Sequence, residues 1–424
     1  MILELNEDLK DELILIRRHL HQFPELSFKE IETSSYVCEV LNRYDIPYET
    51  FGTGVVATIH AKKPGKTLAI RADLDALPIQ EETGLPYRSQ HKDVMHACGH
   101  DIHATVVLGS AIVLQGLREQ MSGTIKFLFQ PAEEILEGAK SLIAAGVLSS
   151  PEVDALMGVH TWPDLPVGTV GLKRGAMTAA SDFITIEVKG KSGHAAHPED
   201  TVDPIVIAGH LLSALQTIVS RELSPLRPAV LTIGRINGGQ APNSIPERVE
   251  LSGMIRSLDE ESRAKIIRST KRICEHTAKT FNGRASVEVK QATSTVSNDP
   301  EMTEHFFDCA TRVLGKERVV RLEEPSLGSE DFAYYLAEKP GVFFALERML
   351  NTMKIRNNRY IVHGLNLVKG RFLQVFKSSV PSRFRLEMKS MMSQKGCENN
   401  GEDTCIYEPS SCTGRVWGRQ NSRA

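Results

Sequence analysis

The first 145 residues alternate two kinds of hydrophobic spacing. Apolar residues that recur every three or four positions predict helices, whereas short runs rich in Val, Ile and Phe predict strands. The elements predicted in this way are a helix over 9–21, strands over 55–60 and 67–71, a helix over 102–118, a strand over 124–130 and a helix over 139–145. Strands separated by helices predict an α/β fold, with a mostly parallel sheet and helices on both faces.

The spacing changes from about residue 181. The predicted elements are now a strand over 183–190, a helix over 204–220, strands over 229–236 and 249–258, a helix over 262–281 and a strand over 285–292. This βαββαβ order is that of an α+β ferredoxin-like unit. Because α/β material resumes near residue 300, we predict a discontinuous catalytic domain over 1–180 and 293–346 with an inserted domain over 181–292.

The end of the chain has a different composition. Residues 347–424 hold 14 basic and 6 acidic residues, against 36 and 47 in residues 1–346, and they carry three of the seven Cys and five of the twelve Met. No helical or strand period is sustained there. We therefore treat 347–424 as a separate basic tail, divergent or independently folded.

Composition narrows the class of protein. A net charge of −3 over 424 residues argues against nucleic acid or an anionic membrane as a partner. The longest apolar stretch, over 105–117, is too short to span a bilayer, and acidic residues interrupt the first twenty positions, unlike a signal peptide. We expect a cytoplasmic protein in which any special Cys acts chemically rather than in a disulfide.

The segment MHACGHDIHA holds the densest group of residues that could bind metal or act in catalysis. Cys98 and His100 flank Gly99, and joint use of their side chains requires a turn, which glycine permits. A thiolate and an imidazole in one turn form half of a plausible zinc site. The alternative is a helix start with a buried Cys and a hydrogen-bonded His.

Further polar groups follow other predicted strands. Glu133 and Glu134 come directly after a buried strand, so that one carboxylate can bind metal while the other faces a water. His160 ends an apolar run, and Asp73 and Asp75 stand at a strand end, where an Asp can orient a metal-bound His. Taken singly, these residues also fit an acidic helix start, a packed loop His and a helix cap.

Assembled in this order, the motifs resemble the zinc-dependent amidohydrolase family of aminoacylases, hippurate hydrolases, deacetylases and auxin-conjugate hydrolases. The resemblance runs from about residue 10 to 346 and includes the segments RRHLHQFPELSFKE, SGHAAHPEDTVDP, NSIPERVELSGMIRSL and GSEDFAYYL. It implies two divalent ions per chain, Zn or Mn with Co or Ni left open. By this resemblance the metal ligands are Cys98, His100, Glu134 and His160, and Glu133 is the general base.

The resemblance also implies that the inserted domain serves as a lid and dimerisation domain, so that the protein is a homodimer. His194 would reach the tetrahedral oxyanion, in the partner subunit's site, and Asn243 and Arg256 would bind the carboxylate end of the substrate. Without the family resemblance, the sequence would favour a loop residue at His194, a turn former at Asn243 and a charge on a strand face at Arg256.

The resemblance ends after Gly341-Val342-Phe343-Phe344. The family's last metal ligand is a His beyond this point, and His363 is the candidate, although its flanks do not match. The charge reversal suggests a divergent or out-of-frame end. The leading hypothesis is hydrolysis of N-acetyl or N-benzoyl amino acids to a carboxylate and a free amino acid. The alternatives are an N-acetyl-diaminopimelate-type deacetylase and a metal-binding dimer disabled by its altered end.

Overall fold

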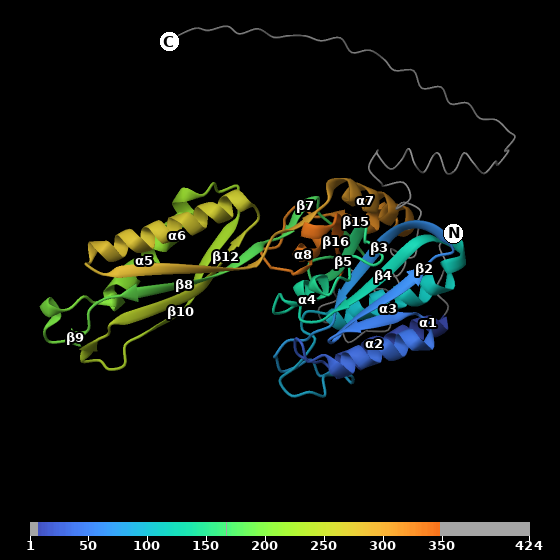
Figure 1. The fold of residues 1–424 in the computed structure, drawn as a ribbon, viewed down its shortest axis with the longest axis horizontal. Helices are drawn as coiled ribbons and strands as arrows, with labels where there is room; N and C mark the ends of the chain where they lie inside the picture. The colour runs from blue at the N-terminus through green and yellow to red at the C-terminus, as the bar shows by residue number, and fades with distance from the viewer. Residues whose placement is uncertain (1–6, 167, 348–424) are drawn as a thin grey trace, which may run out of the picture. The chain divides into compact units, whose positions relative to one another are not determined.

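The computed structural model describes residues 7–166 and 168–347, so the predicted basic tail beyond 347 and His363 lie outside the described residues. An eight-stranded sheet has the order β1-β2-β4-β3-β5-β16-β6-β15 (Figure 1). In chain order its strands are β1 (Tyr48–Phe51), β2 (Gly54–His60), β3 (Lys63–Asp73), β4 (Ser122–Gln130), β5 (Ala155–Trp162), β6 (Val170–Leu172), β15 (Val319–Arg321) and β16 (Gly341–Glu347).

The middle of this sheet is parallel, as predicted. Strand β3 pairs in parallel with β4 on one side and with β5 on the other, and β5 pairs in parallel with β16. The antiparallel pairs β1–β2, β2–β4 and β6–β16 lie outside this block, so the sheet is mixed. Parallel strands are normally covered on both faces, because their crossover helices lie there.

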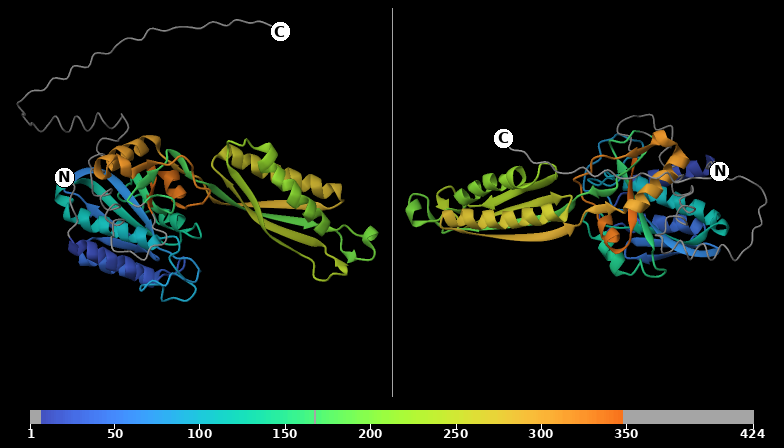
Figure 2. Two further views of the ribbon diagram at one scale, coloured as in Figure 1. Left: turned by 180° about the vertical axis from the view of Figure 1, so that it is seen from behind. Right: turned by 90° about the horizontal axis from the view of Figure 1, so that it is seen from above.

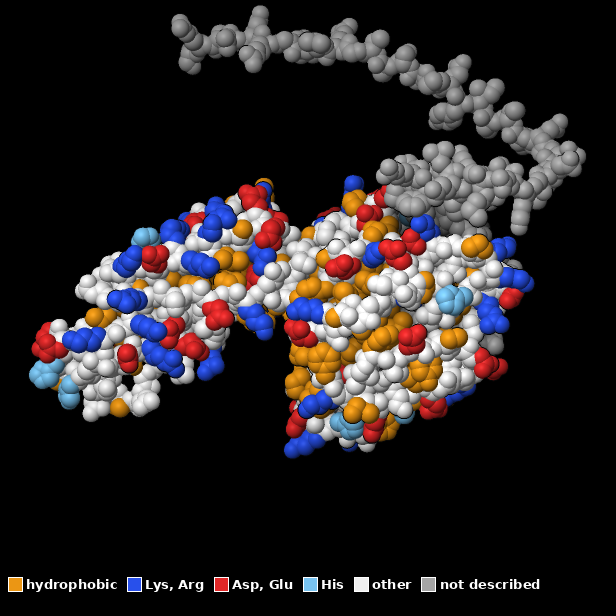
Figure 3. Space-filling view, viewed as in Figure 1, with side chains coloured by type: hydrophobic (Ala, Val, Ile, Leu, Met, Phe, Trp, Pro, Cys, Tyr) orange, Lys and Arg blue, Asp and Glu red, His pale blue; other side chains and the backbone are white. Residues whose placement is uncertain are grey.

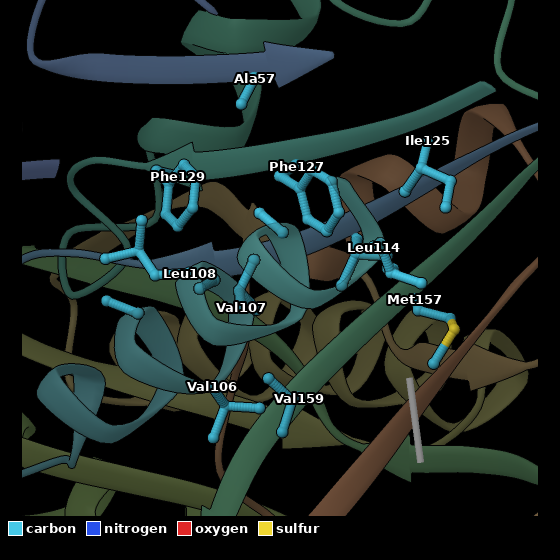
Figure 4. Packing of buried hydrophobic residues seen from close by; sticks show 14 of the residues in the cluster. Ala57, Val106, Val107, Leu108, Leu114, Ile125, Phe127, Phe129, Met157 and Val159 are labelled. Atoms are coloured by element: carbon cyan, nitrogen blue, oxygen red, sulfur yellow. The ribbon is translucent and has the colours of Figure 1, made fainter. Parts of the chain in front are cut away.

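Alternate residues of each central strand enter different cores. In β3, Leu68 and Ile70 pack with helices α1 (Glu7–Gln22), α2 (Ile31–Arg43), α3 (His100–Gly116) and α7 (Pro300–Leu314). Ala69 faces the other core, with α4 (Gly138–Ala144) and α8 (Phe332–Glu338). Figure 4 shows Phe127 and Phe129 of β4 pointing toward Val107 and Leu108 of α3 in the first core. The predicted helices on both faces are therefore present.

The inserted segment forms a second sheet, β10-β12-β8-β13, in which all pairs are antiparallel (Figure 2). Its elements are β8 (Ala180–Lys189), α5 (Pro204–Thr217), β10 (Ala229–Gly238), β12 (Arg248–Ser257), α6 (Glu260–Thr280) and β13 (Arg284–Thr293). The chain leaves through β7 (Gly175–Thr178) and returns through β14 (Val296–Asn298), which pair with each other. The strand and helix order is the βαββαβ order expected; its role as a separate lid domain stays a prediction.

Short elements complete the described chain. They are the ribbon of β9 (Gly193–His194) with β11 (Ser244–Ile245), the 3₁₀ turns η1 (Arg118–Gln120), η2 (Pro198–Asp200) and η4 (Lys316–Arg318), and the π-helical turn η3 (Ile218–Glu222). Within the described residues, no helix combines the length and the apolar character needed to cross a membrane. Basic and acidic side chains are interspersed on the face drawn in Figure 3.

One buried cation joins three separate segments of the eight-stranded sheet and its helices. Arg71 of β3 is fully buried and donates hydrogen bonds to Asp73 at 2.7 Å, to Gln130 at 2.9 Å and to Asp331 at 2.7 Å. Asp331 also accepts hydrogen bonds from the Gln130 amide and the Ala139 backbone N–H. Because each partner comes from a different segment, the guanidinium fixes the ends of β3 and β4 against the start of α8.

We expect Arg71→Met to lower the free energy of unfolding by about 3–5 kcal/mol, because it leaves buried carboxylates without their counter-ion. The control is Arg321→Met, which removes an exposed pair with Glu304 and should cost less than about 1 kcal/mol. Urea unfolding of the metal-free proteins measures both. Equal, small losses would show that the buried pairs contribute no more than the exposed one.

Candidate metal centre and active site

The candidate site lies at the carboxyl ends of the central strands, where α/β proteins commonly bind ligands. Asp73 ends β3, Glu133 and Glu134 follow β4, and His160 lies near the end of β5. Helix α3 begins at His100, directly after Gly99, whose φ of 91° places it in the left-handed region. The structure thus brings together residues that lie up to 87 positions apart in the sequence.

One ring nitrogen of His100 makes no hydrogen bond within the described residues. Its Nδ1 donates to the backbone oxygen of Asp75 at 2.8 Å, so in the neutral ring, the form that binds a metal ion, Nε2 carries the lone pair. That Nε2 is buried and has no hydrogen-bond partner within the described residues. It lies 3.7 Å from Glu134 Oε1 and 3.9 Å from Glu133 Oε2.

Cys98 and His160 form the other side of the site, with 3.3 Å between Sγ and Nε2. Burial alone raises the pKa of the Cys98 thiol, but the neighbouring His100 and His160 rings outweigh it and lower that pKa to about 6. Burial lowers the pKa of His160, and the Cys98 thiolate more than reverses this, raising it to about 9. Cys98 is therefore a thiolate near neutral pH, the form that binds metal.

Asp75 fixes the two adjacent glutamates. Its Oδ1 accepts the Glu133 backbone N–H and its Oδ2 accepts the Glu134 N–H, each at 3.0 Å. Its Oδ2 also accepts the Ser27 hydroxyl at 2.7 Å. Just before them, Ala132 has a φ of 52°, and its N–H donates to the buried Glu30 carboxylate at 2.9 Å. The glutamate loop is thus held by two buried carboxylates.

The site gathers acidic groups away from water. Burial raises the pKa of Glu134 to about 8. Burial, with Glu330 and Asp331 nearby, raises the pKa of Glu133 well above its usual value, although His100 and Arg71 oppose this. A cation placed among these groups would stabilise their ionised forms.

The donor set fits metal ions. Potential ligand atoms of Cys98, His100 and His160 lie within 4.8 Å of one another, and so do those of His100, Glu133 and Glu134. Buried Glu134 Oε1, like His100 Nε2, lacks a hydrogen-bond partner in the described structure. Two buried donor atoms with unused lone pairs are costly unless a cation or water binds them.

One histidine in this site had no predicted role. His103 of α3 is fully buried, with Nδ1 2.6 Å from Asp73 and Nε2 2.8 Å from the Thr161 backbone nitrogen. Burial lowers its pKa to about 4. The spacing of three residues from His100 on a helix, which places both on one face, was the available signal. Of the two aspartates predicted to orient a metal-bound His, Asp75 accepts from His100 through its backbone oxygen, whereas the Asp73 carboxylate accepts from His103.

The remaining predicted residues belong to the inserted segment. His194 pairs with Ser244 in the β9–β11 ribbon, and the Ala195 N–H donates to the Asn243 backbone oxygen, so the ribbon brings His194 and Asn243 together. Arg256 lies at the opposite end of the sheet, paired with Ser181. Its Nη1 is buried and has no hydrogen-bond partner within the described ranges. None of the hydrogen bonds described for these three residues reaches the Cys98–His160 site.

This fold, with thiolate, imidazole and carboxylate groups that could bind metal beside a buried glutamate, is typical of a metal-dependent hydrolase. The chain belongs to peptidase family M20/M25/M40, whose family model matches residues 69–360. The family resemblance seen in the sequence is therefore confirmed.

Several relatives extend over most of the chain. An N-acetyl-L-cysteine deacetylase of Bacillus subtilis is 44% identical over 337 residues, which is 79% of this chain and 80% of the relative. An N-acetyldiaminopimelate deacetylase of Limosilactobacillus reuteri is 38% identical over 375 residues, 85% of this chain and 97% of the relative. A Bacillus subtilis structure described as a dinuclear metal-binding peptidase of family M20 is 34% identical with a TM-score of 0.75, covering 87% of this chain and 98% of its own.

The lowered pKa of Cys98 predicts how its alkylation depends on pH. In the metal-free protein, we expect iodoacetamide to modify Cys98 at a nearly constant rate above about pH 7 and about tenfold more slowly for each pH unit below its pKa of about 6. Added Zn²⁺ should suppress the reaction. Peptide mass spectrometry separates Cys98 from the other cysteines.

Buried Cys274 is the control, because burial raises its pKa to about 12 and it should stay unmodified in the folded protein. A Cys98 rate that keeps rising toward pH 9, as for an ordinary thiol, would contradict the assignment of a thiolate.

Proposed function

We propose that this chain hydrolyses the amide bond of N-acyl amino acids with the help of two divalent metal ions. Cys98, His100, Glu134 and His160 would hold the ions. When bound, the ions would polarise the amide carbonyl and make the attacking water more acidic. The observation that carries the proposal is the pair of overlapping donor groups that share His100, one of which includes the Glu133 carboxylate.

Glu133 is proposed as the general base. It would accept a proton from the attacking water and return it to the departing nitrogen, so that the carboxylate and the free amine form together. In the metal-free protein burial raises the pKa of Glu133, and bound cations would favour the ionised form that a base requires. Asp75 would fix the backbone of both glutamates, so that Glu133 acts as the base while Glu134 binds metal.

The substrate class rests on the relatives and on the inserted segment. Two relatives bear the names of deacetylases of amino acid derivatives, which supports an N-acetyl substrate. The buried, unpartnered Nη1 of Arg256 is suited to a carboxylate, which a guanidinium binds through both oxygens. Asn243 is proposed to bind the same end of the substrate. N-acetyl-diaminopimelate remains the alternative substrate, supported by the 38% identity to its deacetylase.

Glu133→Gln should reduce turnover of N-acetylmethionine and hippurate by at least about 10³-fold while metal content stays near that of the wild type, because the amide cannot accept a proton. Glu134→Gln, its matched neighbour, should lose metal as well as activity. Both are measured by release of free amine with added Zn²⁺ or Mn²⁺ and by metal analysis. Parallel loss of metal in both variants would remove Glu133 as the base.

The same assay separates the alternatives. Faster turnover of N-acetyl-diaminopimelate than of the monocarboxylic substrates would favour the biosynthetic deacetylase. A wild-type chain that binds metal but turns over none of them would favour the disabled protein. In that case the changed end, with His363 as the proposed last ligand, becomes the segment to replace with a family-like one.

We further infer that residues 181–292 serve as a lid and dimerisation domain and that His194 acts in the partner subunit's site. His194 is exposed on the β9–β11 ribbon, at the end of the sheet opposite Arg256 and the connecting strands β7 and β14, which leaves its ring accessible to another subunit. Strand β10 is also an edge of its sheet, and such an edge is a ready site for pairing between chains.

Mixing two inactive variants tests this arrangement. If His194 acts across a dimer, co-expressed Glu133→Gln and His194→Ala chains should recover roughly a quarter of wild-type activity, because half of the dimers then contain one intact site. Co-expression of Glu133→Gln with the double variant Glu133→Gln, His194→Ala is the control and should remain inactive. No recovery in a mixture that sedimentation shows to be dimeric would place His194 in its own subunit's site.

A further inference from the structure

Strand β5 extends beyond its pairing with β3. The last pair is Arg71 with Gly158, whereas β5 continues to Trp162. A buried backbone N–H beyond that point needs another acceptor. For Thr161 the acceptor is a side chain, because its N–H donates to Nε2 of His103 at 2.8 Å.

This hydrogen bond determines the tautomer of His103. A backbone N–H only donates, so Nε2 holds a lone pair and the ring proton is on Nδ1. Nδ1 donates to Asp73 Oδ1 at 2.6 Å, and Asp73 Oδ2 accepts from Arg71 at 2.7 Å. Although His103 lies within ligand distance of Asp73 and His100, both of its nitrogens are engaged. It therefore has no lone pair left for a metal ion.

Thr161 transmits this constraint to two of the proposed ligands. Its backbone oxygen accepts from His160 Nδ1 at 2.7 Å, which leaves His160 Nε2 facing Cys98 Sγ. Its hydroxyl donates to the Cys98 backbone oxygen at 2.9 Å. The loop packs tightly here, since a Cβ on Gly99 would lie 2.7 Å from Thr161 Oγ1.

We propose that His103 is a positioning residue, held as the neutral Nδ1–H tautomer between Asp73 and Thr161, that sets the orientation of His160 and the position of Cys98. The described hydrogen bonds give the geometry of this arrangement. Its effect on metal binding rests on the proposed function. A histidine that acts in this way contributes to metal affinity without touching the metal, as do residues that orient ligands in other metal proteins.

The tautomer is tested on the full chain without metal. Nitrogen-15 NMR of histidine-labelled protein, with His103 assigned by the signals that disappear in His103→Gln, should show a protonated Nδ1 and an unprotonated Nε2. A protonated Nε2, as either the other tautomer or the imidazolium, would overturn the geometry.

Two substitutions separate the two hydrogen bonds. His103→Gln keeps an acceptor near the Nε2 position for the Thr161 N–H, whereas His103→Asn keeps only a donor near the Nδ1 position for Asp73. Zn²⁺ affinity by chelator competition should fall about 10–100-fold in the Asn variant and much less in the Gln variant. The Co²⁺-loaded Asn variant should also lose thiolate-to-metal absorption from Cys98.

Leu108→Ala is the stability control, because Leu108 is a buried core residue of the same helix. It should lower the urea midpoint while leaving Zn²⁺ affinity close to that of the wild type. If affinity in all three variants followed the urea midpoint, or if Gln and Asn behaved alike, the positioning role would be wrong. If wild-type protein bound no metal, the proposed function and the positioning role would both fail, while the NMR result would still decide how His103 is held.

Discussion

The buried guanidinium of Arg71 is the interaction on which the rest of the site depends. A cation removed from water is tolerated only with close counter-charges, and here Asp73, Glu330 and Asp331 supply them. The requirement works in both directions, because these carboxylates would otherwise repel one another at the strand ends. Pairing at this point allows the fold to gather acidic groups close to Glu133, the proposed base.

From Arg71 the order extends outward in steps. Asp73 accepts from Arg71 and from His103, His103 accepts from Thr161, and Thr161 orients His160 and Cys98. On the other side, Asp75 holds the glutamate pair. The proposed ligands are thus oriented before a metal binds, which reduces the conformational cost of binding. Such preorganisation is a general requirement of sites that act by precise placement.

Much of this architecture was predictable from local pattern. The alternating strands and helices, the parallel centre and the βαββαβ order follow from spacing, and helix α3 begins two residues before its predicted start. Strand β5 was less visible, because Gly158 and His160 interrupt its apolar residues. The contact of Arg71 with Asp331 joins residues 260 positions apart, and no periodicity in the sequence signals it. The spacing of His103 from His100 was a local signal, but its role depends on a strand 58 residues away.

The N-terminal segment has a consequence for shortened chains. Ser27 and Glu30 precede the region matched by the family model, residues 69–360, yet they bind Asp75 and Ala132 directly. Earlier in the same segment, Arg17 and His21 contact the buried Asp101 beside His100. A fragment cut to the matched boundaries would therefore expose carboxylates whose partners had been removed. Residues that hold the candidate site in place thus lie well before the first residue matched by the family model.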